Sequence, residues 1–339
     1  MSTVEGLDLS ALTRFFTEHV PDFRGELQAE LLQGGRSNLT YRLTDGRGIW
    51  VLRRPPLGGL TPSAHDMARE HRVVAALAGS GVPVARAVAL GDAKVMGVPF
   101  ALAEYVDGVV IRTEEHLNAL SDQAVADCAH TLVDVLARLH AIEPAAVGLG
   151  GFGRPEGYLA RQVVRWYDQW ERVRTRLLPD IDALHERLAQ ACPPESGASI
   201  VHGDFRIDNA ILDPGNPSGV RALVDWEMAT LGDPLADLGL HLVYTDPAFA
   251  PVLAGEAAST SRRLPAPADL AERYAVASGR SLDNLGYYIA LGYFKIAVIA
   301  EGIHARHLQG LTVGSGFETV GDAPAPLAAA GLRALGRDS

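Results

Sequence analysis

One stretch of this 339-residue chain constrains the fold more than any other, because it places three short apolar runs inside a region with an otherwise helical pattern. The runs are "SIV", "AILD" and "VRALV", and the loop between the first two reads "HGDFRIDN". Short apolar runs bounded by turn residues are typical of buried strands. The sequence therefore predicts a small β-structure within a helical half, with a polar loop at its edge.

The surrounding half is predicted to be mainly helical. In "VADCAHTLVDVLARLH" the apolar residues recur at the helical period and form one stripe, which consists of Val125, Cys128, Leu132, Val135, Leu136 and Leu139. The apolar run from Tyr287 to Ala300 is interrupted by Lys295 and is shorter than a bilayer requires. We expect it to be a buried helix.

The first third of the chain has the pattern of a sheet. Three strands are expected between about Glu26 and Arg54, joined by "GGRSN" and "DGRG", which are typical hairpin turns. A helix from about Ser63 to Ala78 and two further strands, in "RAVALGD" and "VPFALAEYV", follow. The predicted fold class is therefore α+β, with a lobe at residues 1–106 that contains a five-stranded antiparallel sheet and one helix, and a larger, mainly helical lobe at 107–339.

Composition excludes several classes of protein. A net charge of -11 argues against a nucleic-acid-binding protein, which needs an excess of Lys and Arg. Cys128 and Cys192 are too few for a disulfide framework, and the first residues lack the pattern of a signal peptide. We expect a cytoplasmic protein that binds neither nucleic acid nor membrane; the sequence leaves the oligomeric state open.

The polar loop has the spacing of a phosphotransfer site. In H-x-D-x-x-x-x-N, the Asp accepts the proton of the acceptor hydroxyl and the Asn binds metal, and these places are filled by Asp204 and Asn209. Asp225 follows the apolar run "ALV" and is expected to complete a Mg²⁺ site with Asn209, because Mg²⁺ prefers oxygen ligands. The alternative is a merely polar turn, which the matched order of three residues disfavours.

Upstream residues suit the nucleotide. The turn before the second strand can offer amide N–H groups to phosphates, through Gly34, Gly35, Arg36, Ser37 and Asn38, although paired glycines also occur in plain turns and G-x-G-x-x-G is absent. Strand alternation directs Val51 and Arg53 to one face, with Arg53 on the phosphates where a kinase usually has Lys. Glu70 lies on an apolar helix face and needs a partner, for which Arg53 is the natural candidate.

Together these motifs resemble the aminoglycoside phosphotransferase and choline kinase family, small-molecule kinases with a protein-kinase-like fold. The resemblance runs from "GGRSN" through "EYVDG" and "HGDFRIDNAIL" to "VDWEMATLGDPLADLG". It implies that Glu104 and Val106 offer backbone groups to adenine. It also implies that Asp233 and Asp237 are structural, bracing the catalytic loop and the start of a helix.

"VLRRPP" and "RQVVRWYDQW" are similar to the branch of kinase-like domains fused to some acyl-CoA dehydrogenases, which is linked to phosphorylating hydroxy acids or hydroxyacyl-CoA. The expected activity is ATP- or GTP-dependent transfer of the γ-phosphoryl group to a small-molecule hydroxyl, with Mg²⁺. An antibiotic kinase of the aminoglycoside type, or a nucleotide-binding module with little turnover, stays open. A metal-dependent hydrolase is disfavoured because no second His cluster completes a two-metal site.

Other residues have simpler interpretations. The aromatic residues in Trp166–Trp170 have helical spacing and are assigned to the core in preference to an acceptor pocket. His202 is expected to brace the loop, and His304 and His307 lack a third metal ligand. The sequence assigns no role to Tyr244 or Lys295.

Overall fold

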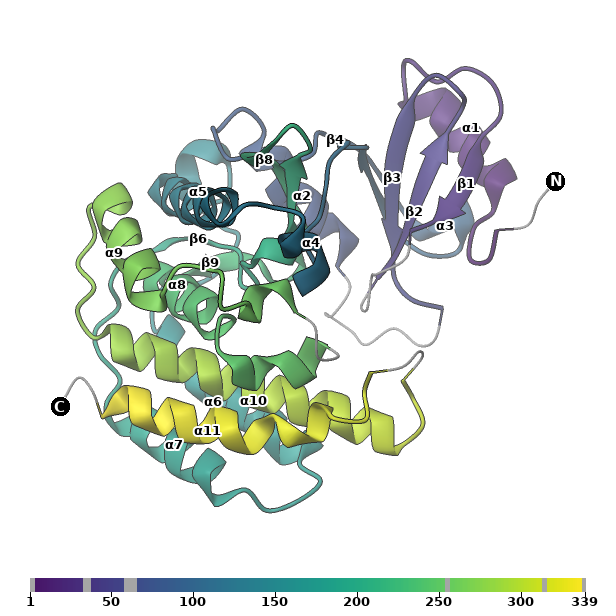
Figure 1. The fold of residues 1–339 in the computed structure, drawn as a ribbon. Helices are drawn as coiled ribbons and strands as arrows, with labels where there is room; N and C mark the ends of the chain where they lie inside the picture. The colour runs from purple at the N-terminus through teal and green to yellow at the C-terminus, as the bar shows by residue number, and fades with distance from the viewer. Residues whose placement is uncertain (1–3, 33–37, 58–65, 254–256, 313–315, 337–339) are drawn as a thin grey trace. The chain divides into compact units, whose positions relative to one another are not determined.

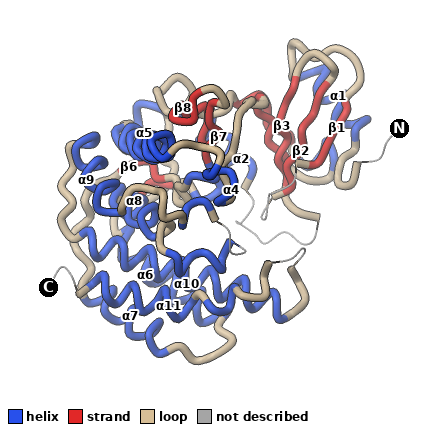
Figure 2. The backbone as a smooth tube through the Cα atoms, viewed as in Figure 1, coloured by secondary structure: helices blue, strands red, loops and turns tan. Residues whose placement is uncertain are grey.

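The computed structural model describes residues 4–32, 38–57, 66–253, 257–312 and 316–336. The chain divides into a smaller unit, Met1–Gly108 with Arg221–Ala229, and a larger unit, Val109–Val220 with Thr230–Ser339. The smaller unit holds a five-stranded antiparallel sheet and the larger one is mainly helical (Figures 1 and 2), so the predicted fold class is confirmed. The division of function at residues 106 and 107 stays a prediction.

The sheet of the smaller unit has the strand order β1-β2-β3-β5-β4. Its elements are α1 (Leu9–His19), β1 (Gln28–Leu31), β2 (Leu39–Thr44), β3 (Ile49–Arg54), α2 (Met67–Leu77), β4 (Ala87–Gly91), α3 (Ala93–Met96) and β5 (Phe100–Glu104). All five predicted strands are present. The short helix α3 was not predicted, and it starts at Asp92, whose side chain accepts a hydrogen bond from Lys94 N.

The turn between β2 and β3 explains the register of the hairpin. Asp45 accepts hydrogen bonds from Arg47 N and Gly48 N at 2.9 and 2.8 Å, and Gly46 has a φ of 85°, which favours glycine. The resulting alternation buries Trp50, Leu52 and Arg54 and leaves the intervening residues of β3 on the other face. Helix α1 packs against the face of β3 that carries Trp50 and Leu52, and together they form the core of this unit.

Helix α2 packs beside β4 and β5 and begins one turn later than the predicted start at Ser63. Asp66 has a non-helical conformation and accepts a hydrogen bond from Arg69 N at 2.9 Å, so it is the N-cap. The predicted apolar face consisted of Met67, Glu70, Val74 and Leu77; three of these are buried, but Val73 is buried in place of Val74, which is only half-buried.

Residues Arg221–Ala229 belong to the smaller unit although they lie far along the chain. Leu223 N donates to Pro83 O at 2.8 Å, and Arg69 Nη2 donates to Ala229 O at 3.1 Å. These bonds tie the two ends of the segment to α2 and to a residue that follows it. The segment carries Asp225, which is therefore held beside the sheet of this unit.

The larger unit is built around packed helices, with short strands inserted along the chain between α7 and α8 (Figure 2). Its helices of four residues or more are α4 (Glu114–Asn118), α5 (Asp122–Ala141), η1 (Pro144–Val147), α6 (Tyr158–Val173), α7 (Pro179–Gln190), α8 (Pro234–Val243), η4 (Pro247–Leu253), α9 (Pro267–Ser278), α10 (Leu285–Leu308) and α11 (Pro324–Leu335). Its strands are β6 (Ser199–Val201), β7 (Ala210–Asp213), β8 (Asn216–Leu223, which runs into the smaller unit) and β9 (Thr230–Gly232). Strand β9, which pairs with β6, was not predicted.

The apolar stripe predicted for α5 is confirmed, since all six of its residues are buried. Cys128 is fully buried, and burial raises the pKa of its thiol to about 12. This cysteine therefore packs as a small hydrophobic residue, as predicted.

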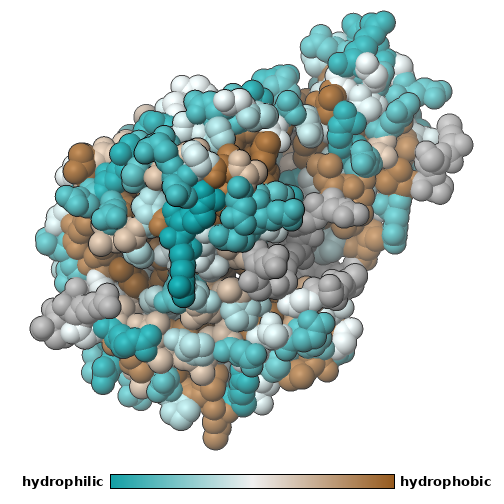
Figure 3. Space-filling model, viewed as in Figure 1, coloured by the Kyte–Doolittle hydropathy of each residue, from teal (hydrophilic) through white to brown (hydrophobic). Residues whose placement is uncertain are grey.

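Helix α10 extends the apolar run that was predicted to be a buried helix. Among the described helices it alone combines a length and apolarity sufficient to cross a bilayer, but most of its apolar window is buried inside the protein. Hydrophilic and hydrophobic residues are intermixed over the face shown in Figure 3. The prediction of a core helix is confirmed.

Helix α10 crosses α8 at unusually close range. A Cβ at Gly239 would lie 2.6 Å from the backbone carbon of Tyr288, and one at Gly292 would lie 3.3 Å from the Cα of Leu240. Glycine at both positions permits this approach. Lys295, one helical turn after Gly292, is thereby brought to the loop that α8 supports.

Candidate active site

The loop between β6 and β7 brings two predicted site residues together. Asn209 ends a 3₁₀ turn, Ile207–Asn209, and its Nδ2 donates to Asp204 O at 2.8 Å and to Asp204 Oδ2 at 3.0 Å. One side-chain amide thus fixes both the backbone and the carboxylate of Asp204. The H-x-D-x-x-x-x-N spacing places Asn209 where its side chain can form these two hydrogen bonds and close the loop.

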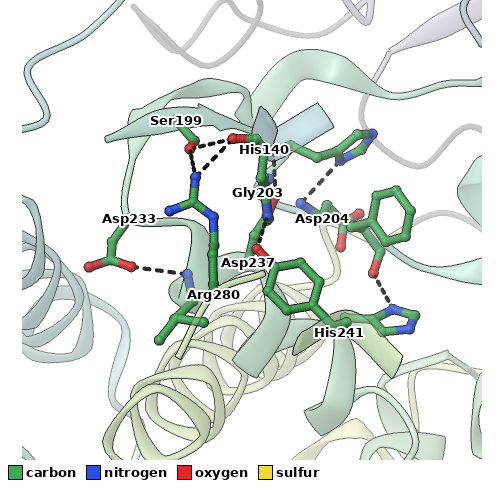
Figure 4. Close-up of polar contacts among 12 residues, drawn as sticks. His140, Ser199, Gly203, Asp204, Asp233, Asp237, His241 and Arg280 are labelled. Atoms are coloured by element: carbon green, nitrogen blue, oxygen red, sulfur yellow. Dashed lines mark hydrogen bonds and ion pairs between the residues drawn. The ribbon is translucent and has the colours of Figure 1, made fainter. Parts of the chain in front are cut away.

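Asp237 of α8 braces the start of the same loop (Figure 4). Its Oδ2 accepts from His202 N at 2.6 Å and its Oδ1 accepts from Gly203 N at 2.8 Å, while His140 Nε2 lies 3.3 Å from Oδ2. Burial alone would raise the pKa of Asp237, but the hydrogen bonds and charges of His140 and His202 lower it below the ordinary value. The structural role expected for Asp237 is confirmed.

Asp233 has the second structural role that was expected. It is the N-cap of α8 and accepts from Leu235 N at 2.9 Å. Its other oxygen accepts from Ser196 N at 2.7 Å and from the hydroxyl of Tyr288 at 3.0 Å. Asp233 therefore joins the start of α8 to α10 and to the segment before β6.

We expect Asp237→Ala to lower the free energy of unfolding by about 3–5 kcal/mol, the cost of breaking a buried charged network. Two backbone N–H groups would lose their acceptor in a buried region. Urea denaturation measures the change. Glu186→Ala is the matched control, because Glu186 is exposed on α7, and it should change stability by less than about 0.5 kcal/mol. Equal, small changes for both variants would contradict the bracing role.

The carboxylate of Asp204 is surrounded by donors and positive charge. Tyr244 donates its hydroxyl hydrogen bond to Oδ1, and Arg206 Nε lies 3.3 Å from Oδ2. Lys295 Nζ donates to the neighbouring Gly203 O at 2.6 Å. Burial alone would raise the pKa of Asp204, but Arg206, Tyr244, Lys295 and His202 together lower it to about 2. Asp204 is therefore ionised at neutral pH.

Arg206 is itself held in place from two sides. Its Nη1 lies 2.9 Å from Asp208 Oδ2, and its Cζ lies 5.6 Å from the centre of the Tyr244 ring, which is within cation–π range. Burial raises the pKa of Asp208 and so does the charge of Asp204, whereas Arg206 opposes the shift. These contacts give Arg206 a defined position beside the carboxylate that it neutralises.

Sequence reasoning missed Tyr244, Arg206 and Lys295 as neighbours of Asp204. Tyr244 and Lys295 are 40 and 91 residues further along the chain, and no motif joins them to the loop. Lys295 did carry a signal, because a cation in the middle of an apolar helix is costly unless it has a function. Arg206 lies inside the loop and could have been noticed as a charge beside Asp204.

In the smaller unit, Arg53 connects two predicted residues. Its Nη1 lies 2.5 Å from Glu70 Oε1, and its Nη2 lies 3.0 Å from Asp225 Oδ1. The predicted pairing of Arg53 with Glu70 is confirmed. The bond to Asp225 was not predicted, and it uses the two-pronged geometry of a guanidinium, which a Lys ammonium lacks.

Arg53, Glu70 and Asp225 form a triad, and burial affects the pKa values of Glu70 and Arg53 within it. Glu70 is only 6% exposed, and burial raises its pKa against the opposing effect of Arg53. Burial would lower the pKa of Arg53, but Glu70 and Asp225 together raise it, so the guanidinium stays charged. Two carboxylates therefore share one guanidinium.

Asp225 has a φ of 66° and a ψ of 58°, which is the left-handed region that few residues other than glycine adopt. Asp and Asn tolerate this conformation better than other side chains. Such an outlier points to a residue whose position is required by function. This side chain remains 30% exposed although its Oδ1 is paired with Arg53.

Of the predicted phosphate loop, Gly34, Gly35, Arg36 and Ser37 lie outside the described residues. Asn38 is buried, and its Nδ2 donates to Glu227 Oε2 at 3.1 Å. This bond connects the end of the loop to the segment that carries Asp225.

The predicted adenine-binding segment follows β5. Glu104 N donates to Arg86 O at 2.9 Å, and the Glu104 side chain pairs with Arg86 at 2.5 Å. Val106 is half-buried, and neither its N–H nor its C=O forms a hydrogen bond with another described residue. Val106 thus has a donor and an acceptor available for a ligand, as the prediction requires.

The predicted metal ligands offer suitable atoms. The Nδ2 of Asn209 is used by Asp204, which leaves its amide oxygen available, and Asp225 has one carboxylate oxygen that no described residue contacts. Amide and carboxylate oxygens are both ligand types that Mg²⁺ accepts. Within the described ranges, no group of three or more His, Cys, Asp or Glu side chains could hold a metal ion.

The remaining expectations concern packing. Trp166 and Trp170 are buried in α6, as predicted, while Tyr167 stacks on His185 with ring centres 3.7 Å apart. His202 accepts a hydrogen bond from Asp204 N at its Nδ1, at 3.3 Å, which confirms that it braces the loop.

Known proteins share both the sequence and the fold of this chain. Residues 28–273 match the model of the phosphotransferase enzyme family. Mouse acyl-CoA dehydrogenase family member 10 is 36% identical over 83% of this chain and 27% of its own length. The chain spans less than half of each curated relative that it matches here.

Solved structures agree with this assignment. A candidate aminoglycoside phosphotransferase from Ralstonia eutropha is 33% identical, with a TM-score of 0.83 over 97% of this chain and 98% of that one. A thermostable mutant of an aminoglycoside phosphotransferase, solved with ADP and hygromycin B, is 15% identical and shares the fold, with a TM-score of 0.62 over 98% of each chain. The family resemblance and the acyl-CoA dehydrogenase branch are thus confirmed, and this chain belongs to the phosphotransferase enzyme family as a small-molecule kinase with a kinase-like fold.

Proposed function

We propose that this kinase transfers the γ-phosphoryl group of ATP to the hydroxyl of a hydroxy acid or of its CoA thioester. The observation that carries the proposal is the positive environment of Asp204, where Arg206 and Lys295 surround the carboxylate. An aminoglycoside is a polycation and is recognised by acidic side chains, whereas cations beside the reacting hydroxyl favour an anionic acceptor. The relationship to acyl-CoA dehydrogenase family members supports the same acceptor class.

In the proposed reaction, Asp204 accepts a hydrogen bond from the acceptor hydroxyl and orients its oxygen toward the γ-phosphorus. The oxygen–phosphorus bond forms, the bond to the bridging β–γ oxygen breaks, ADP departs, and the hydroxyl proton passes to Asp204. The low pKa of Asp204 makes it a weak base, so orientation contributes more than early deprotonation. This agrees with the loose transition state of phosphoryl transfer, in which the proton moves late.

The proposal assigns nucleotide binding to the smaller unit. The available N–H and C=O of Val106 suit adenine, and Arg53 suits phosphates because its guanidinium has N–H donors beyond the two that Glu70 and Asp225 use. Support for an adenine nucleotide comes from the structural neighbour that was solved with ADP. Residues Gly34–Asn38 are proposed to cover the phosphates with amide N–H groups.

Asp225 and Asn209 are proposed to hold Mg²⁺ through their available oxygens. When bound, the ion would neutralise charge on the phosphates. Arg53 has to share Asp225 with it, because one oxygen of Asp225 is already paired with the guanidinium. The pairing of Arg53 with Asp225 would therefore influence how tightly Asp225 binds the ion.

An ADP-release screen tests the acceptor class. The purified protein is supplied with ATP or GTP, Mg²⁺ and one acceptor at a time, chosen from hydroxy acids, their CoA thioesters, choline, sugars and kanamycin. We expect a hydroxy acid or its thioester to stimulate release at least about tenfold above the acceptor-free rate, and kanamycin to have no effect.

Phosphorylation of kanamycin but of no hydroxy acid would contradict the proposed acceptor class and identify the protein as an antibiotic kinase. Nucleotide binding without stimulation by any acceptor would identify a binding module with little turnover. Faster turnover with GTP than with ATP would change the assigned nucleotide and leave the proposed acceptor class unaffected.

A further inference from the structure

Two cations that share one tryptophan ring, Lys295 and Arg165, lack an acidic partner at salt-bridge distance, and Lys295 donates to the loop that carries Asp204. In the part of the chain that the structure describes, no carboxylate oxygen lies within 4.0 Å of Lys295 Nζ or of the Arg165 guanidinium. The chain as a whole has 30 Lys and Arg against 41 Asp and Glu, so a cation can readily find a partner. Two cations without a salt-bridge partner, one of them bonded to the residue next to Asp204, therefore require an explanation.

The two cations are organised around one aromatic ring. Lys295 Nζ lies 5.5 Å from the centre of the Trp166 ring, and Arg165 Cζ lies 5.5 Å from the same ring. Trp166 is 7% exposed, so the ring is a fixed support for both charges. Lys295 comes from α10 and Arg165 from α6, and these helices pack on each other.

The ammonium of Lys295 has unused hydrogen-bonding capacity. It has three donors, of which one is used by Gly203 O at 2.6 Å. Burial lowers the pKa of Lys295 to about 8, the repulsion of Arg165 also lowers it, and Asp204 and Asp237 only partly oppose the shift. The site therefore holds a poorly solvated positive charge that an anion would stabilise.

A purely structural role does not account for this arrangement. Support for the Gly203 carbonyl needs one donor, which a neutral side chain could provide without the cost of a buried charge. It also gives no reason for a second cation on the same ring. Arg165 is exposed and makes no hydrogen bond within the described chain, so it is available to a ligand.

We propose that Lys295 and Arg165, supported by Trp166, form the subsite that binds an oxyanion of the acceptor while its hydroxyl lies on Asp204. This inference rests on the proposed function and specifies how that acceptor is recognised. The shared chemistry is an oxyanion, either the carboxylate of a free hydroxy acid or a phosphate of its CoA thioester. Lys295 and Arg165 are specificity-determining residues in this scheme.

The test compares acceptors that differ only in the anion. The free hydroxy acid with the highest rate is paired with the diol in which CH₂OH replaces its carboxylate, and the CoA thioester is paired with the N-acetylcysteamine thioester, which lacks phosphates. Lys295→Met and Arg165→Ala should each raise KM for the anionic member of one pair by about 10- to 100-fold and leave KM for its neutral partner unchanged. The pair that responds identifies the source of the oxyanion.

Controls separate recognition from support of the loop. Arg172→Ala removes another exposed arginine of α6, the helix that carries Arg165, and should leave the KM values of all four acceptors unchanged. Lys295→Arg should restore most of the anion preference. Equal losses of kcat for anionic and neutral acceptors would assign Lys295 to the loop alone and overturn the proposal, as would unchanged anion preference in both variants. Arg165→Ala keeps the test decisive if Lys295→Met does not fold.

The pH profile provides a second readout. Lys295 is cationic below its pKa of about 8 and neutral above it, so kcat/KM for the anionic acceptor should fall as the pH rises through about 8. The neutral acceptor should not show this decline, and Lys295→Arg should abolish it. The same decline for both acceptors would exclude Lys295 as its origin. If no hydroxy acid or thioester is phosphorylated at all, the proposed acceptor class is wrong, whatever the variants of Lys295 and Arg165 show.

Discussion

Asp204→Asn should lower kcat by roughly 10²–10⁴ while the protein still binds nucleotide, because a carboxylate that orients the acceptor hydroxyl and takes its proton contributes about this much. The amide has the shape of the carboxylate but cannot take the hydroxyl proton. Its oxygen can still accept the hydrogen bond from Tyr244, so the loop keeps one of its side-chain contacts. Single-turnover assays measure the rate, and titration with a fluorescent ATP analogue measures binding.

The matched control is Asp208→Asn, since Asp208 is in the same loop but pairs with Arg206 and is assigned no proton transfer. It should reduce kcat far less than Asp204→Asn does. A thermal melt of both variants checks that the loop change has not unfolded the protein. Wild-type turnover by Asp204→Asn would identify "HGDFRIDN" as a polar turn.

Asp225→Asn should fail in a different way, with weaker Mg²⁺-dependent nucleotide binding and turnover about 10²–10³-fold lower. The substitution removes a charged metal ligand and keeps an oxygen, so excess Mg²⁺ should restore part of the activity. Asn is the suitable replacement because it tolerates the φ of 66° at this position, whereas Ala would add backbone strain. Nucleotide titrations at low and high Mg²⁺ measure the effect.

The contrast between the two variants separates their roles. Asp204→Asn should bind the nucleotide with the same Mg²⁺ dependence as the wild type, and Asp225→Asn should not. Normal Mg²⁺-dependent binding by Asp225→Asn would mean that its bond to Arg53 is its main function. The Arg53–Glu70 pair remains in this variant, so a large loss of stability is not expected.

Much of the fold could be read from local patterns. Strand alternation placed Val51 and Arg53 on one face of β3, and the structure buries Trp50, Leu52 and Arg54 on the other, since the side-chain period of a strand is two. Glu70 was predicted to need a partner, and Arg53 provides it, because a buried unpaired carboxylate is too costly to persist. These rules act within a few residues or between neighbouring elements.

The details that failed depended on a single local cap in one case and on a distant strand pairing in another. The helix predicted from Ser63 begins after Asp66, where one side-chain cap decides the end. Strand β9 is only three residues long, and its pairing with β6 supplies the signal that its sequence lacks. Short elements are stabilised mainly by tertiary contacts, so local propensity predicts them poorly.

The sequence by itself determined the family, the fold class and the spacing of Asp204 and Asn209, because these depend on motifs and on periodic burial. Tertiary structure alone decided what surrounds Asp204. Tyr244 reaches it from the end of α8, and Lys295 reaches its loop from α10, which can approach because Gly239 and Gly292 remove side chains at the helix crossing. Electrostatic interactions depend on distance in space, not on separation along the chain. The charge at this loop, and with it the kind of acceptor we propose, is therefore a property of the packing of helices that the motifs do not include.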